Sequence, residues 1–335
     1  MSETCLNGKK VLMFGPKFFG YREAIADEIR SLGGEVDLYD ERPNNGAVCK
    51  IMLRYNVPLY RPVTRKYYKE IIEKNRNKEY DYVFVIKSEA IDGKIFSDLK
   101  EAFPKAEFIL YLWDSVDNVP GGKEKIKMYD RVLTFDSVDA KEYGLFSRPL
   151  FYRNEFAKKY ENRENYKYEV AFVGTAHSIR PRIVNQLEAQ CEGEGKKVFK
   201  FLFLPHPIVF IYNKLLNRAY KGVSKKDISF KPMSPQEINE VYENSKCILD
   251  VEHSAQRGLT MRTIEMIGVG KKLITTNKLI KDYDFYNADN IFVIERDNPK
   301  VEEAFWTSSY KDVPQEILNR YSLENFVKDI FDIKE

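Results

Sequence analysis

Short apolar runs alternate along the chain with longer stretches in which apolar residues recur every three or four positions. The short runs are rich in β-branched and aromatic residues and are bounded by glycine or polar residues, which is typical of buried strands. In the first half, the pattern predicts strands at 9–14, 35–40, 80–87, 106–115 and 131–136. In the second half, it predicts strands at 170–174, 197–204, 247–252 and 290–295.

The longer stretches predict amphipathic helices between the strands. The helix at 22–34 is closed by glycines, and the helix at 234–245 opens with Ser234 and Glu237 in the spacing of a capping box. Further helices are expected at 65–77, 180–191, 207–220 and 321–335, with a short one through Lys141 and Tyr143. Strands separated by helices imply right-handed crossovers and a parallel sheet.

The chain is long enough for two domains. Its 335 residues exceed one ordinary core and fit two of roughly 150 residues each. The segment 151–169 is charged and poor in aliphatic residues, which indicates a linker. We therefore expect an α/β fold with two Rossmann-like, doubly wound parallel-sheet domains at 1–155 and 165–315, followed by a terminal helix within 316–335.

Composition narrows the function classes. With 54 basic and 51 acidic residues the net charge is only +3, which disfavours a nucleic-acid binder. The four cysteines lack CxxC spacing, which argues against structural zinc and a disulfide scaffold and favours a reducing cytoplasm. The N-terminal sequence MSETCLNGKK has no apolar core of a secretory signal, and no window approaches the roughly 20 apolar residues of a membrane span. A cytoplasmic location is expected.

Ligands of open α/β sheets bind beyond the carboxyl ends of the strands. That rule selects four segments: 15–21, 113–118, 174–182 and 252–265. The third, GTAHSIRPR, offers a glycine, a helix N-terminus and the charges of Arg180 and Arg182 to an anion. It equally fits a plain turn with solvated arginines. Because neither this loop nor GPKFFG matches GxGxxG, and GxxxxGK[ST] is absent, nicotinamide enzymes and P-loop NTPases are disfavoured.

The most specific segment is RGLTMRTIEMIGVGKKLITTN, residues 257–277. Thr260 is a favourable N-cap for a short helix. Met261, Ile264 and Ile267 would form the buried face of that helix.

Arg262 and Glu265 share the neighbouring face of this helix, where their three-residue spacing lets them touch. If exposed, they form a local ion pair worth well under about 1 kcal/mol. At the carboxyl edge of a sheet, however, a carboxylate can accept hydrogen bonds from a ribose diol while arginines and helix N–H groups hold phosphates. The segment is therefore a candidate site for a nucleotide diphosphate.

The runs MRTIEMIGVGKKLITT, LDVE with RGLTMRTIE, FVGT and YDRVLTFDSVDAKEYG resemble the GT-B glycosyltransferases, and more narrowly the CgeB-like branch named for a spore maturation protein. The resemblance covers most of the chain in layout. It implies two domains facing across a cleft, with the helix from about Tyr321 crossing back onto the N-terminal domain.

The resemblance also implies site residues. Glu265 matches the carboxylate that binds the donor ribose, and Gly174 with Thr175 matches the glycine loop facing the donor phosphates. The implied donor-binding set is Gly174, Thr175, Arg180, His253, Arg257, Gly258, Thr260, Met261, Arg262 and Glu265. The implied acceptor-side loop contains Gly15, Phe19, Gly20 and Tyr21. Arg257 departs from the pattern, because retaining enzymes often have a second glutamate there, and so the stereochemistry is left undecided.

An inverting enzyme needs a general base for the acceptor hydroxyl. Asp114, at a predicted strand end, is the first candidate, Asp117 the second and Asp136 a weaker third. Each of these aspartates could instead cap a helix or turn. GT-B enzymes neutralise the leaving diphosphate with basic side chains and helix dipoles, so neither a metal nor another cofactor is expected.

The expected function is that of a bacterial, metal-independent glycosyltransferase in polysaccharide biosynthesis, with a nucleotide-diphosphate sugar, expected to be a UDP-sugar, as co-substrate. A hydroxyl of a glycan or lipid-linked glycan would be the acceptor, and the inner membrane surface a peripheral contact. Residues 54–68 are rich in basic and aromatic side chains. They could contact the acceptor or an anionic membrane surface, or simply form a solvated helix face. A nucleotide-sugar 2-epimerase of the same fold and a catalytically silent binding module are the alternatives.

Overall fold

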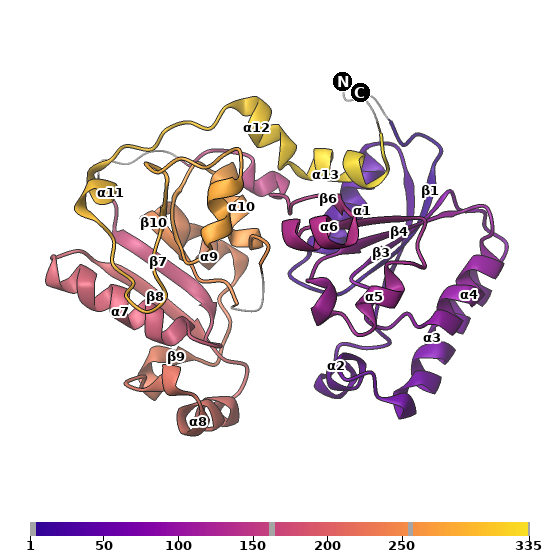
Figure 1. Cartoon of the computed structure of the whole chain (residues 1–335), viewed down its shortest axis with the longest axis horizontal. Helices are drawn as coiled ribbons and strands as arrows, with labels where there is room; N and C mark the ends of the chain where they lie inside the picture. The colour runs from indigo at the N-terminus through magenta and orange to yellow at the C-terminus, as the bar shows by residue number, and fades with distance from the viewer. Residues whose placement is uncertain (1–4, 161–164, 254–256, 334–335) are drawn as a thin grey trace. The chain divides into compact units, whose positions relative to one another are not determined.

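The chain forms two α/β units, each built on a six-stranded parallel sheet (Figure 1). The computed structural model describes residues 5–160, 165–253 and 257–333. One unit consists of Met1–Arg153 with Ser322–Glu335, and the other of Asn154–Tyr321. The predicted fold class, two doubly wound parallel-sheet domains, is confirmed.

The sheet of the first unit has the strand order β2-β1-β3-β4-β5-β6. Its strands are β1 (Lys10–Gly15), β2 (Glu35–Asp40), β3 (Tyr82–Ile86), β4 (Glu107–Leu112), β5 (Arg131–Thr134) and β6 (Phe146–Ser147). All five strands predicted in this half are present. The two-residue edge strand β6 is too short to give a periodic signal, and the sequence did not predict it.

Helices cover both faces of this sheet because successive strand residues point to opposite sides. Leu12 and Phe14 pack into the core beneath α2, α3 and α4. On the other face, Phe326 of α13 contacts Tyr111 of β4 edge to face. The helices are α1 (Tyr21–Ser31), α2 (Ala47–Arg54), α3 (Arg61–Asn75), α4 (Gly93–Ala102), α5 (Gly122–Lys125), α6 (Ser137–Tyr143) and α13 (Leu323–Ile330). The last helix of the chain is thus part of the first unit.

The second sheet has the order β12-β11-β10-β7-β8-β9. Its strands are β7 (Tyr168–Thr175), β8 (Val198–Phe203), β9 (Ile228–Ser229), β10 (Ser245–Asp250), β11 (Lys272–Thr275) and β12 (Ile291–Val293). The four predicted strands are present, and β11 lies in the β-prone tail of the 257–277 segment. Its helices are α7 (Arg180–Gly193), α8 (Pro207–Leu216), α9 (Pro235–Glu243), α10 (Met261–Gly268), α11 (Glu303–Thr307) and α12 (Gln315–Arg320). The capping box of Ser234 and Glu237 forms as predicted at the start of α9.

The predicted linker 151–169 is largely folded into the two units. Phe151 is fully buried in the first unit, in contact with the ring of Phe326. In the second unit the backbone N–H of Tyr160 donates to the carbonyl of Val269 at 3.0 Å. Residues 161–164 of the predicted linker lie outside the described residues. The boundary between the two units, at Arg153 and Asn154, falls within the predicted linker, and residues on either side of it pack onto their own unit.

The four cysteines, Cys5, Cys49, Cys191 and Cys247, are free thiols in the structure, and the last three are buried. In the described part of the chain, no helix has the length and apolar character needed to cross a bilayer. Over the same residues, no group of three or more His, Cys, Asp or Glu side chains is arranged to hold a metal ion.

Candidate functional site

The strand order of the second sheet reverses at β7, which has β8 on one side and β10 on the other. At such a switch point, the loops leaving the carboxyl ends diverge, and ligands of open α/β sheets bind between them. Residues 176–179 lead from β7 into α7, and residues 251–260 lead from β10 into α10; of the latter, 254–256 lie outside the described residues. All ten predicted donor-binding residues belong to β7, α7, α10 or these loops.

Asp250, the last residue of β10, joins that strand to the start of α10. Its carboxylate is almost fully buried and accepts hydrogen bonds from the hydroxyls of Thr260 and Thr263 at 2.6 and 2.8 Å. The Thr260 hydroxyl is also the N-cap of α10, since it accepts the backbone N–H of Thr263. The predicted cap is confirmed. The role of Asp250 was not predicted, because an aspartate at a strand end carries no pattern that reveals its partners.

Arg262 links the hydrogen bonds around Asp250 to two further elements, β7 and α9. Its guanidinium donates to Asp250 at 3.0 Å, to the Tyr242 hydroxyl at 3.0 Å, and to the backbone carbonyl of Val173 on β7. It also lies over the ring of Phe172, 5.6 Å from the centroid. Burial alone would lower the pKa of Arg262, but Tyr242 and Asp250 outweigh burial and raise it above its ordinary value. Arg262 is therefore a fixed cation at the carboxyl edge of the sheet, held within the protein.

Gly174 makes room for that arginine. A Cβ atom at this position would lie 3.0 Å from Cζ of Phe172 and 3.3 Å from a terminal nitrogen of Arg262. Packing against Phe172 and Arg262 thus explains why a glycine occupies this position. The close approach of a ligand, expected from the sequence, would be a separate reason. Thr175 follows at the end of β7, where its carbonyl faces Arg180 at 3.5 Å.

Arg180, the first residue of α7, is a second cation at this edge, but without a carboxylate partner. Its Nε donates to the backbone carbonyl of Val251 at 2.6 Å, and it makes no ion pair with any described residue. Burial and the positive charge of Arg262 lower the pKa of Arg180 to about 10. The nearby carboxylates of Asp250 and Glu252 act in the opposite direction but do not offset burial and Arg262. Arg180 is thus a largely buried cation without a direct ion pair among the described residues, a group that an anionic ligand would stabilise.

His177 is affected by the same positive charges. Burial, followed by the charges of Arg180, His253 and Arg262, lowers the pKa of His177 to about 4. Near pH 7 the ring is consequently neutral and offers one N–H donor. The predicted donor residue His253 is exposed and close by, with a distance of 5.6 Å between the centroids of the two rings.

The loop that carries His177 is held in place from behind. The Tyr220 hydroxyl donates to the carbonyl of Ala176, and the Asn217 amide donates to the carbonyl of Ser178 at 3.2 Å. Ser178 itself has a φ of 53°, an uncommon conformation for a residue with a side chain. Strained residues of this kind persist where the surrounding structure fixes them, and they concentrate at binding sites.

Arg180, His177 and the N-terminus of α7 are the groups at this edge that could bind a phosphate or diphosphate. The first turn of this 14-residue helix carries the positive end of the helix dipole. Most of its backbone N–H groups are already used, because Arg180 donates to the carbonyl of His177 at 3.2 Å, Ile183 donates to the carbonyl of Ile179 at 3.1 Å, and Pro181 has no N–H. Such N-termini bind phosphates readily when basic side chains accompany them. The structure thus brings Gly174, Thr175, Arg180 and His253 to one place.

Glu265 lies deeper in the unit than expected. It is only 7 % exposed, and after burial its charge contributes to the raised pKa values of Tyr242 and Tyr160. The predicted contact between Arg262 and Glu265 is wrong, because Asp250 and Tyr242 hold the Arg262 guanidinium on the other side. The predicted apolar face of α10 is correct, with Met261, Ile264 and Ile267 at most 9 % exposed.

The carbonyls of Arg257 and Gly258 both accept from the side-chain amide of Asn277, at 3.3 and 3.2 Å. Asn277 thus fixes the described end of the loop that enters α10. Nearby, the buried Glu252 receives hydrogen bonds from Arg296 and Thr276. The sequence reasoning missed both partners. The polar residue at the end of the predicted strand 247–252, and the asparagine that ends the β-prone tail of 257–277, are the signals that could have found them.

The second unit contains an Asp-x-Asp triplet, Asp282–Tyr283–Asp284, a pattern that can hold a metal ion. Asp284 accepts hydrogen bonds from the Tyr321 hydroxyl at 2.6 Å and from Arg320 at 2.8 Å. The triplet therefore helps to hold the segment after α12.

In the first unit, the predicted acceptor-side loop follows β1. Gly15 ends the strand, and its carbonyl accepts from Arg22 at 3.0 Å. Phe19 is 76 % exposed with a φ of 46°, and Gly20, at 77°, is the N-cap of α1. Tyr21 instead turns inward and contacts the rings of Trp113 and Phe151. Of the four predicted loop residues, Phe19 therefore offers a large side chain to solvent, and its neighbour Phe18 does so as well.

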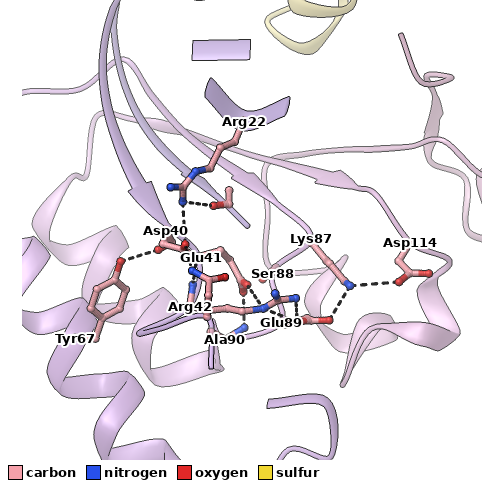
Figure 2. A network of polar contacts seen from close by, with 12 residues as sticks. Arg22, Asp40, Glu41, Arg42, Tyr67, Lys87, Ser88, Glu89, Ala90 and Asp114 are labelled. Atoms are coloured by element: carbon pink, nitrogen blue, oxygen red, sulfur yellow. Dashed lines mark hydrogen bonds and ion pairs between the residues drawn. The ribbon is translucent and has the colours of Figure 1, made fainter. Parts of the chain in front are cut away.

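The three aspartate candidates lie in different surroundings. Asp114 follows β4, 29 % exposed, and contacts Lys87 at 3.4 Å (Figure 2) and the Asn118 amide at 3.1 Å. Asp117 is 69 % exposed, with Lys123 at 3.8 Å. Asp136 is fully buried as the N-cap of α6, so it is structural.

Figure 2 shows that Asp114 lies at one end of a network of charged groups at the switch point of the first sheet, where β2 and β3 flank β1. Glu89 binds Lys87 at 2.8 Å and Arg42 at 2.5 Å. Lys87 and the next residue, Ser88, both have positive φ, at 78° and 57°. The sequence reasoning missed this network, although the charged residues directly after two predicted strands could have indicated it.

Glu41 is the most deeply buried member of the network. It has no exposed surface, and it accepts the backbone N–H of Ala90. Burial, together with the nearby charge of Glu89, raises the pKa of Glu41 to about 8. Glu89 and the buried Lys125 also line a pocket of about 270 Å³ between α2, α3 and α5.

The sequence matches no family model and no curated protein at a significant level. Solved structures are similar over nearly the whole chain. An α,α-trehalose-phosphate synthase from Burkholderia xenovorans has 9 % identity and a TM-score of 0.62, covering 97 % of this chain and 100 % of its own. A UDP-GlcNAc 2-epimerase from Methanocaldococcus jannaschii has 12 % identity and a TM-score of 0.53, covering 97 % and 99 %. The glycosyltransferase SnogD from Streptomyces nogalater has 10 % identity and a TM-score of 0.50, covering 98 % and 100 %. At these identities, the comparisons establish that the chain has the GT-B fold.

Proposed function

We propose that the protein is a glycosyltransferase that transfers a sugar from a nucleotide diphosphate, expected to be UDP, to a hydroxyl of a glycan or lipid-linked glycan. The observation that carries the proposal is the cationic edge of the second sheet, where Arg180 lacks a carboxylate partner and His177 is neutral. A diphosphate would supply the missing negative charge. The GT-B fold of the neighbours supports this choice of ligand.

Each group has a defined task in this proposal. Arg180, the α7 N-terminus and the neutral His177 stabilise the charge that develops on the leaving diphosphate. Glu265 accepts hydrogen bonds from the ribose hydroxyls of the donor. Asp114 is our first candidate for the base and Asp117 our second; a well-placed general base contributes about 10²–10⁴ in rate. We assign no metal and no other cofactor to the reaction.

The finer family assignment is also a proposal. The MRTIEMIGVGKKLITT run forms α10 and β11, and it places Glu265 on the helix beside the candidate phosphate site. This supports the CgeB-like branch of GT-B enzymes. Arg257, in place of a second glutamate, favours neither a retaining nor an inverting reaction.

A panel of nucleoside diphosphate sugars tests the function. We expect one donor to raise the melting temperature and to be hydrolysed slowly without an acceptor. Conversion of the donor to an epimer would instead support the 2-epimerase, the alternative favoured by the similarity to the Methanocaldococcus jannaschii enzyme. If a nucleotide sugar raises the melting temperature but is not consumed with any acceptor supplied, the protein is a catalytically silent binding module. If no nucleotide stabilises the protein, the proposal is wrong.

The ribose assignment has its own variant. Glu265→Gln keeps the size of the buried side chain but removes its charge, so we expect donor affinity to fall at least about tenfold with the melting temperature nearly unchanged. Calorimetric titration with UDP measures the first and thermal unfolding the second. If UDP binds Glu265→Gln as tightly as it binds the wild type, Glu265 does not contact the ribose.

A further inference from the structure

Helix α8, Pro207–Leu216, presents apolar side chains to solvent, which is unusual for a helix beside a sheet. Ile208, Ile211, Tyr212 and Leu215 are between 57 % and 78 % exposed. Their spacing of three, four and seven residues places them in one stripe along the helix. Leu216, 68 % exposed, extends the stripe at its end.

The opposite side of α8 explains why the stripe points outward. Val209 and Phe210 pack against the core of the second unit, and Asn217 and Tyr220 after the helix bind the loop that carries His177. Lys214 donates to the carbonyls of Tyr220 and Val223. These contacts fix the orientation of the helix, so the apolar stripe cannot turn inward without breaking them.

The segment of sequence that contains α8 carries charge of one sign. Residues 195–226 contain no Asp or Glu. Four basic residues follow α8, and all four are exposed and make no ion pair with any residue that the structure describes: Arg218, Lys221, Lys225 and Lys226. Apolar side chains in one stripe, with unpaired cations and a tyrosine beside it, are the features of a helix that lies in the surface of an anionic bilayer.

We propose that α8 docks the second unit onto an anionic lipid bilayer, with the apolar stripe inserted and the four cations at the phosphate headgroups. A second copy of the chain is a poorer occupant, because two-fold pairing of the stripes would bring the cations of both copies together. The contacts of Asn217 and Tyr220 mean that a docked α8 would also hold the His177 loop near the lipid surface. This inference is independent of the proposed sugar transfer.

Co-sedimentation with vesicles tests the proposal on the full-length protein, without any nucleotide sugar. We expect binding to phosphatidylcholine vesicles that contain about 30 % phosphatidylglycerol, and little binding to phosphatidylcholine alone. Ile211→Ser with Leu215→Ser should reduce the bound fraction at least about tenfold. Arg218→Gln with Lys221→Gln should weaken binding and reduce its dependence on salt.

Phe146→Ser is the matched control. It removes from the first unit an apolar side chain that is as exposed as Ile211, and it should leave vesicle binding unchanged. Unchanged melting temperatures would show that the variants still fold. The proposal is overturned if the wild type ignores anionic vesicles, or if the α8 variant binds them normally. It is also overturned if the stripe instead mediates a dimer in solution and the protein does not sediment with lipid.

Discussion

Arg180 and Arg182 are two residues apart on α7, yet only one of them has a carboxylate partner. Arg182 lies 3.2 Å from Asp297, whereas Arg180 donates only to backbone carbonyls. If the edge of the sheet binds a diphosphate, Arg180→Ala should weaken UDP binding by about tenfold to hundredfold. Arg182→Ala, which removes the same charge from the same helix, should change it less than about threefold. Isothermal titration calorimetry measures both.

The imidazole of His177 gives a second readout of that prediction. The sequence contains only three histidines, so their ring signals can be assigned by substitution. A bound diphosphate offsets the cations that lower the pKa of His177 from its ordinary value to about 4, and we therefore expect this pKa to rise when UDP saturates the protein. An NMR pH titration that finds the same pKa with and without UDP would place the nucleotide elsewhere.

Glu41 should make the first unit less stable as the pH rises. Its pKa is about 8 in the folded chain and close to the ordinary glutamate value of 4.5 when the chain is unfolded, so between these values the folded state binds more protons. The unfolding free energy must then fall with increasing pH, by roughly 2–5 kcal/mol across the window. Glu41→Gln removes the titration, and its stability relative to the wild type should increase from about pH 5 to about pH 8. Chemical denaturation at several pH values measures this, and parallel profiles would contradict it.

The positions of the charged residues could be predicted from the sequence, but their partners could not. Arg262 shows the difference, because its spacing from Glu265 predicted a contact along the helix. Asp250 and Tyr242 are 12 and 20 residues away along the chain, and they bind the guanidinium instead. Local spacing carries no information about such long-range pairs. For the same reason, the sequence placed Asp136 among the candidate bases although it is buried as a helix cap.

At the scale of elements, β7, β10, α9 and α10 are joined by a single polar cluster. Asp250 ends β10, Arg262 and the two threonines belong to the start of α10, Val173 lies on β7 and Tyr242 on α9. The cluster fixes the helix that carries Glu265 relative to the strand that leads to His177. Any geometry that the second unit presents to a phosphate and a ribose thus depends on one buried carboxylate.

Asp250→Ala should therefore destabilise the second unit specifically. The substitution leaves the largely buried Arg262 without its counter-ion, a change that typically costs about 3–5 kcal/mol. The chain has two tryptophans, Trp113 in the first unit and Trp306 in the second, so a Trp113→Phe background makes fluorescence report the second unit alone. Asp297→Ala, at an exposed aspartate, is the control and should have little effect. If both variants unfold at the same denaturant concentration, Asp250 is not a structural tie.

Periodicity predicted the elements better than their surroundings. All nine predicted strands formed, most of them because they are short apolar runs that become buried on both faces. The strand Glu35–Asp40 is an exception, since it has no fully buried residue. The edge strands β6 and β9, of two residues each, were missed because such short segments have no period. For α8 the apolar pattern correctly predicted a helix but could not show that its apolar stripe faces solvent. Which face of a helix is covered depends on its neighbours, and these are distant in the sequence.

At the scale of the whole molecule, the chain leaves its first unit at Arg153 and returns to it at Ser322. Leu323, Phe326, Val327 and Ile330 of α13 are at most 2 % exposed in that unit, although they come from the last 13 residues of the 335. The periodicity of the C-terminal segment predicted the helix, whereas its place on the first unit came from the family resemblance. The first core is therefore incomplete until the end of the chain has been synthesised.

Phe326→Ala should accordingly unfold the first unit more easily while leaving the second unchanged. Its ring is fully buried and contacts Tyr111 and Phe151, so its removal should cost about 3–5 kcal/mol. In a Trp306→Phe background, the fluorescence of Trp113 should report this loss as an earlier transition. Phe305→Ala removes a buried phenylalanine of the second unit. In a Trp113→Phe background it should shift the unfolding transition reported by Trp306, and in the Trp306→Phe background it should leave the Trp113 transition unchanged. If Phe326→Ala also shifted the Trp306 transition by the same amount, the two units would unfold as one. The stability of each unit would then not be separable from that of the other.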